Sequence, residues 1–130
     1  MPKMSKERAA HVDELGTAED RHDDLGEYTV DFISSSRGMD LAPLLKGLPD
    51  DRCQCPHWGF VFKGRVAVDY ADRSEVYEAG DAFYMPPGHV RSVEPGTELV
   101  QFSNTQELAA TARVMKRHML DRENAVWTDG

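Results

Sequence analysis

The sequence has 130 residues and a formal net charge of −8, with 40% hydrophobic and 29% charged residues. This length and composition predict one soluble globular domain. We expect neither nucleic acid nor a membrane surface as a partner, because both are bound through clustered Lys and Arg. No apolar run is long enough to cross a bilayer and the polar N-terminus lacks a signal-peptide core, so we expect a cytoplasmic protein.

The N-terminal region, residues 1–26, is polar and charged and predicts a flexible or loosely docked arm. The stretch EYTVDFI at 27–33 is rich in β-formers and predicts the first strand. Short predicted strands then alternate with Gly and Pro turns. They are 53–62, 65–70, 74–77, 82–85, 90–93 and 97–102. This spacing is typical of an antiparallel sandwich or closed barrel, so we predict an all-β domain over 27–103.

The last part of the sequence changes to a helical period. Apolar residues recur there at Leu108, Ala112, Met115 and Met119. Asn104, with Glu107 three residues on, forms a capping-box pattern that marks the start of a helix. We therefore predict a C-terminal helix within 104–122, from about residue 106, packed on the outside of the barrel. Residues 123–130 would form a tail.

Side chains that bind metals are concentrated at Cys53, Cys55 and His57. Residues two apart on a strand point to the same face, so all three could enter one cavity. Thiolate and imidazole are usual ligands of zinc and other borderline-soft metals. His89 is a fourth candidate, because the Pro-Pro-Gly corner before it fixes the backbone angles. A buried cysteine is also often a small apolar residue without further chemistry, so local spacing alone leaves both interpretations open.

Glycine and proline mark two stretches: CQCPHWGFVFKG, which ends at Gly64, and GDAFYMPPGHV, which contains Gly80, Pro86 and Gly88. The positions of these glycines and prolines resemble the two sequence motifs of the cupin family, and the resemblance extends from residue 53 to 101. The first cupin motif is H-x-H, three or four residues, Glu, six residues, Gly. The second is Gly, five residues, Pro-x-Gly, two residues, His. The resemblance implies a small antiparallel β-barrel, or double-stranded jelly roll.

The resemblance places His57 at the Glu ligand of the family, Cys53 at the second His and Asp51 at the first. Arg91 occupies the His of the second motif, and His89 lies two residues earlier. The substituted ligand set implies a divalent transition metal, with zinc favoured by the cysteine and nickel, copper or iron as alternatives. Cupins include dioxygenases, isomerases, epimerases, cyclases and non-enzymatic binders, so the fold does not settle the reaction.

Two charged residues are candidates for substrate binding. Arg91 could hold an anionic substrate, since guanidinium recognises carboxylates well, although a surface ion pair is the more common role. Glu98 could serve as an acid or base if its side chain points inward. On the face opposite His57, the row of Trp58, Phe60 and Phe62 predicts an apolar surface that a helix or a second subunit covers. We expect a homodimer.

Three functions remain open at this point. An open site with three protein ligands, Cys53, His57 and His89, would suit a small-molecule metalloenzyme of oxygenase, isomerase or cyclase type. A closed site that also uses Cys55 would suit a binding or sensing module with structural zinc. A barrel without metal would be a binder of small apolar ligands.

Overall fold

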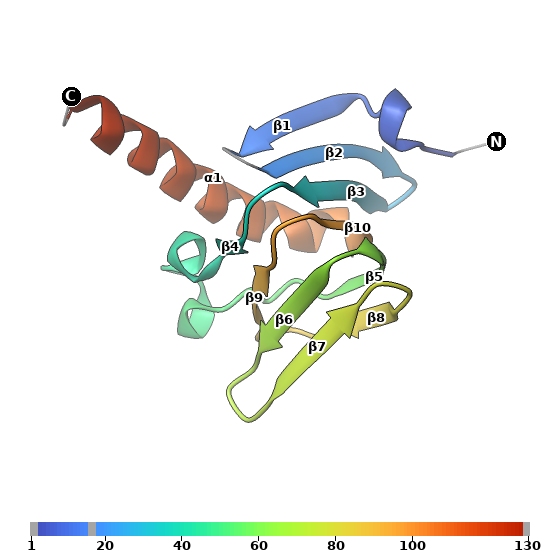
Figure 1. Ribbon diagram of the computed structural model, residues 1–130. Helices are drawn as coiled ribbons and strands as arrows, with labels where there is room; N and C mark the ends of the chain where they lie inside the picture. The colour runs from blue at the N-terminus through green and yellow to red at the C-terminus, as the bar shows by residue number, and fades with distance from the viewer. Residues whose placement is uncertain (1–2, 16–17, 129–130) are drawn as a thin grey trace.

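Two antiparallel sheets pack face to face in the computed structural model, which describes residues 3–15 and 18–128 (Figure 1). The larger sheet has the strand order β1-β2-β3-β10-β5-β8, and the smaller has the order β4-β9-β6-β7. The strand bounds are β1 His11–Leu15, β2 Ala18–Leu25, β3 Tyr28–Ser35, β4 Met39–Asp40, β5 His57–Lys63, β6 Arg65–Asp69, β7 Ser74–Glu78, β8 Ala82–Met85, β9 Val90–Val93 and β10 Thr97–Asn104. The predicted all-β jelly-roll class is confirmed.

The core lies between the two sheets and follows from the alternation of side chains along each strand. It contains Val61, Val66, Val68, Tyr70, Tyr77, Phe83, Met85, Val93 and Leu99, all of them buried. Gly59 is required for this packing, because a Cβ at that position would overlap the Val100 carbonyl oxygen and the Phe83 ring. Val100 and Phe83 lie on β10 and β8, the two strands that flank β5 in the larger sheet, so glycine leaves room for the Phe83 ring to lie across β5.

The N-terminal region differs from the predicted arm. After a 3-10 turn, η1 (Lys6–Arg8), it forms strands β1 and β2, and β2 pairs with β3 along its whole length, from Ala18 opposite Ser35 to Leu25 opposite Tyr28. A two-residue turn with Gly26 at φ 63° connects β2 to β3. The β2 sequence, AEDRHDDL, has almost no β-forming residues. Backbone pairing to an apolar strand and a favourable hairpin turn outweigh its low propensity.

The predicted strand 53–62 is too long at its start, because β5 begins at His57. Pro56 has no N–H to donate to a ladder, so the preceding residues leave the sheet. Cys53 instead forms an isolated bridge with His89. The first core strand is likewise shifted, to Tyr28–Ser35. The remaining predicted strands match β6 to β10 within a few residues.

The C-terminal helix α1 (Thr105–Thr128) is confirmed, and it continues through most of the predicted tail. Residues 129 and 130 lie outside the described residues. Asn104 Oδ1 accepts a hydrogen bond from the Glu107 backbone N–H at 3.1 Å, which caps the helix as predicted. The helix lies against the short 3-10 segment η2 (Ala42–Leu45) and the ends of β10 and β3 (Figure 1). Among the described residues, no helix combines the length and apolarity that a membrane span needs.

Candidate metal site

Backbone hydrogen bonds hold Cys53 beside His89, although the two residues are far apart in the chain. The Cys53 N–H donates to the His89 carbonyl at 2.9 Å. The Cys53 carbonyl accepts from the N–H groups of Gly88 and His89 at 2.8 and 3.2 Å. Gly88 adopts φ 89°, a conformation that a residue with a side chain rarely takes. The Pro-Pro-Gly corner therefore positions both residues of this pair.

His57 completes a cluster of three side chains. It is the first residue of β5, and its Nε2 lies 3.8 Å from Cys53 Sγ. One ligand atom from each of Cys53, His57 and His89 lies within 4.8 Å of the others. A tetrahedral zinc ion with bonds of about 2.0–2.3 Å separates its ligand atoms by roughly 3.5 Å. The convergence that the sequence predicted for these three residues is confirmed, and the spacing fits a metal after small adjustments.

Hydrogen bonds orient both imidazole rings. His89 Nδ1 lies 2.7 Å from the Pro86 carbonyl oxygen, which can only accept, so Nδ1 carries the proton and Nε2 has a free lone pair. His57 Nδ1 lies 2.6 Å from Ser103 Oγ, which leaves Nε2 facing Cys53. Metal-binding histidines in proteins have such outer partners on the nitrogen that does not bind the metal.

The cluster is buried, and this decides its charge. The exposed fractions of Cys53, His57 and His89 are 5%, 3% and 2%. Burial, with a contribution from the Arg91 charge, holds the pKa of His57 well below its usual range. Burial also lowers the pKa of His89 to about 4, against the opposing effect of its hydrogen bond to Pro86. Both imidazoles are therefore neutral at pH 7, which is the form that binds metals.

Cys55 is also buried, but it lies outside this three-residue cluster. Its Sγ lies 3.6 Å from the Pro56 carbonyl oxygen. Burial and the neighbouring Cys53 raise the pKa of the Cys55 thiol to about 12, so it stays protonated at neutral pH. Asp51, which the family resemblance aligned with a ligand position, is exposed and accepts a hydrogen bond from the Gly47 N–H.

Helix α1 closes one side of the cluster. Thr111, which is 4% exposed, places its Oγ1 3.8 Å from Cys53 Sγ. Leu108 and Met115, one turn before and after it, pack against the small cluster of Leu45, Cys53 and Cys55. Of the helical stripe predicted from the sequence, Leu108 and Met115 are thus confirmed as packing residues over the cysteines, whereas Ala112 is exposed and Thr111 is buried in its place.

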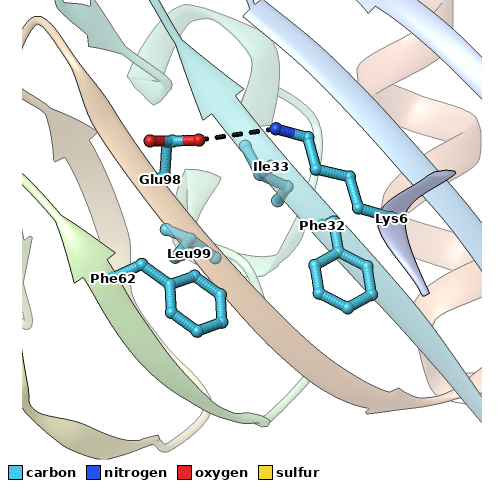
Figure 2. Close-up of a pocket in the computed structure, with 6 residues that line it drawn as sticks. All are labelled: Lys6, Phe32, Ile33, Phe62, Glu98 and Leu99. Carbon is cyan, nitrogen blue, oxygen red and sulfur yellow. Dashed lines mark hydrogen bonds and ion pairs between the residues drawn. The ribbon is translucent and has the colours of Figure 1, made fainter. Parts of the chain in front are cut away.

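The two predicted substrate residues lie in different places. Arg91 is partly buried, and its Nη1 donates to Gln101 Oε1 at 2.5 Å. Glu98 does not point inward, since its carboxylate lies 3.4 and 3.3 Å from the amines of Lys6 and Lys63. Figure 2 shows Glu98 directed toward Lys6 across a shallow pocket of about 130 Å³. None of the residues that line this pocket belongs to the Cys53, His57 and His89 cluster.

Sequence reasoning missed several polar residues of the interior, among them Asp20, Asp31, Gln101 and Ser103. Asp31 and Gln101 lie between apolar neighbours in strands that were predicted, and this placement was a usable signal. Asp20 could not have been found in this way, because its strand was predicted as an arm.

Solved structures resemble this chain throughout the barrel. An RmlC-like cupin from Shewanella frigidimarina has a TM-score of 0.54 at 20% identity over 80% of this chain and 91% of that one. A protein of unknown function from Rhizobium leguminosarum has a TM-score of 0.56 at 19% identity, covering 79% and 95% of the two chains. KdgF from Halomonas has a TM-score of 0.51 at 17% identity, covering 72% and 86%.

Neither family models nor curated proteins give a match to the sequence. At these low identities, similar structures establish architecture and leave activity open. The order of the strands, the glycine and proline corners and the similar structures agree, and this chain has the cupin fold.

Proposed function

We propose that this protein binds a divalent transition metal, with zinc favoured, through Cys53, His57 and His89. The observation that carries the proposal is the cluster itself, with neutral imidazoles and ligand atoms within 4.8 Å of one another. One thiolate and two imidazoles form a set that suits zinc, with nickel, copper or iron as alternatives. When bound, the metal would supply Lewis-acid chemistry to a small molecule in the barrel.

Three protein ligands leave a fourth position for water or substrate, which is the arrangement of catalytic zinc. The separation of Cys55 from the cluster supports this open site. Arg91 extends into the same interior, where it donates to the Gln101 side chain, and its guanidinium would hold an anionic group of the substrate. We therefore favour a metal-dependent small-molecule enzyme.

A non-catalytic binding or sensing module is the second candidate. Its support is the burial of all three ligands, with α1 in contact with Cys53, which would restrict exchange with solvent. The two candidates differ in the fourth ligand. X-ray absorption on the zinc-loaded protein should detect one sulfur, two imidazoles and one light exchangeable ligand for the enzyme. Two sulfurs would support the closed structural site.

Elemental analysis of protein purified without added metal tests the metal site itself. We expect about one metal per chain, and its loss in His57→Ala and His89→Ala. His11→Ala is the matched control, because His11 stacks on His22 at the exposed β1–β2 hairpin, where a loosely held ion could also bind. Metal that disappears with His11 and persists without His89 would contradict the proposal.

We further propose that the protein forms a homodimer through the outer face of the larger sheet. Exposed aromatic side chains lie on four adjacent strands of this face: Tyr28, Trp58, Phe60, Phe62, Tyr84 and Phe102. Trp58 and Tyr84 stack with ring centroids 4.9 Å apart. An apolar patch of this kind usually marks an interface, and a two-fold contact would bury the same patch on both subunits.

A further inference from the structure

A row of polar side chains crosses the inner face of the larger sheet. It runs from Asp20 on β2 through Asp31 on β3 to Gln101 on β10, and Arg91 reaches it from β9. Gln101 Nε2 donates to Asp31 Oδ2 at 3.3 Å, and Gln101 Oε1 accepts from Arg91. Gln101 and Asp31 are 3% and 4% exposed. The row is therefore an interior network with two carboxyl groups and one guanidinium.

The two carboxyl groups differ in their surroundings. Asp31 Oδ2 accepts the hydrogen bond from Gln101, whereas Asp20 Oδ1 is buried and has no hydrogen-bond partner. Two neighbouring carboxylates in a buried site cannot both be ionised easily, because each charge repels the other and both lose hydration. One guanidinium compensates one negative charge. The proton should therefore reside on Asp20, which has the poorer set of partners.

We propose that Asp20 and Asp31 share one proton, so that Asp20 is a neutral carboxylic acid that can donate its proton to an anionic ligand held by Arg91. This inference rests on the ligand-binding role proposed for Arg91. In the transfer, the O–H bond of Asp20 breaks and a new O–H or N–H bond forms on the ligand. The negative charge then moves from the ligand to the carboxyl pair, where it remains close to Arg91.

The charges around Asp20 agree with this arrangement. Burial and then the neighbouring Asp31 raise the pKa of Asp20 to about 9. Asp13 on β1, opposite Asp20 in the register, acts in the same direction, and Arg91 opposes them. His22 on β2 lies opposite Asp31 in the register, and its Nε2 is 3.0 Å from the Asp13 carboxylate. The N-terminal hairpin thus contributes a functional group to the barrel interior in addition to an edge of the sheet.

Carbon-13 NMR on protein with labelled aspartate carboxyl carbons tests the pair directly. One aspartate should titrate near pH 9 in the parent. This signal should disappear in Asp20→Asn, shift to lower pH in Asp31→Asn and shift to higher pH in Arg91→Gln. Asp23→Asn is the matched control on the same strand, and it should leave the signal unchanged, because alternation places Asp23 on the other face of β2.

Acetate serves as the probe for the ligand. If it binds at Arg91, it neutralises the guanidinium and should raise the titration point of Asp20 in the parent but not in Arg91→Gln. Aspartates that all titrate near pH 4, or a high titration that persists in Asp20→Asn, would overturn the carboxyl pair. An acetate effect that is absent, or equal in Arg91→Gln, would overturn the donation to a ligand.

Amide NMR spectra of each variant should resemble those of the parent, which verifies that the variant is folded. Metal content, measured separately, distinguishes a failure of this inference from a failure of the metal site, because Asp20→Asn should retain its metal.

Discussion

The hydroxyl of Thr111 lies 3.8 Å from Cys53 Sγ, and this contact joins helix α1 to the three-residue cluster. With a bound metal, Cys53 would be a thiolate, and the Thr111 O–H would donate to it. A hydrogen bond of this kind orients a ligand and adjusts its basicity. The helix is therefore part of the proposed metal site, in addition to its role as a cover for the barrel.

Thr111→Val should weaken metal binding by about tenfold, because outer partners of metal ligands commonly contribute that much. Valine keeps the shape of threonine and removes only the hydroxyl. Thr111→Ser is the control, and it should bind nearly as well as the parent. Competition with a chelator measures the affinities, and the sulfur-to-metal charge-transfer band of the cobalt-substituted protein reports directly on the thiolate. An unchanged band in the valine variant would contradict this role.

Replacement of the two cysteines should have different effects. Cys53→Ala removes a ligand of the proposed site, so metal content should fall from about one per chain to near zero, and thermal stability should fall with it. Cys55→Ala should keep its metal, because that thiol lies outside the cluster and stays protonated at neutral pH. Equal loss of metal from both variants would instead indicate a closed site with two sulfur ligands.

The fold was largely predictable because its signals are local. Glycine and proline at Gly64, Gly80, Pro86 and Gly88 set the turns, and alternating apolar residues mark the strands between them. The β2 strand was not predictable, since its residues favour no strand and its pairing to β3 is a property of the folded chain. Propensity judged one residue at a time does not detect a strand that is stabilised by its pairing to a neighbouring strand.

Of the four candidate ligands that the sequence offered, Cys53, His57 and His89 lie together and Cys55 lies outside their cluster. Strand parity, from which the sequence predicted that Cys53, Cys55 and His57 share one face, is not the reason. Cys53 is held by a backbone bridge to His89, and it is not part of β5. Contacts such as the one from Thr111 depend on how the helix packs against the barrel, and residue spacing in the sequence does not predict that packing.

Trp58→Glu should convert the proposed homodimer into a monomer. Trp58 is 43% exposed and lies between the rings of Tyr28 and Tyr84, so a carboxylate there would be buried in an apolar interface. Val76→Glu is the matched control, because Val76 is equally exposed at 43% but lies on the smaller sheet. Sedimentation equilibrium gives the masses. A parent that is already monomeric at micromolar concentration would refute the dimer.

Asp20→Asn should stabilise the protein at neutral and alkaline pH. The pKa of Asp20 is raised from 3.8 to about 9, mainly by burial and by Asp31. Between these values the unfolded chain releases the proton and the folded chain retains it, so the parent loses stability as pH rises through this window. Asparagine has no proton to retain, and its variant should lack this loss.

The resulting gain at pH 7 should be on the order of 2–4 kcal/mol, since one unit of pKa corresponds to about 1.4 kcal/mol. Below about pH 3.8 both states of the parent hold the proton, and the two proteins should have similar free energies of unfolding. Urea denaturation of the metal-free proteins at several pH values measures the difference. A free-energy difference between parent and variant that stays constant from pH 4 to pH 9 would show that Asp20 is ionised in the folded protein, and the proton-sharing pair would then be wrong.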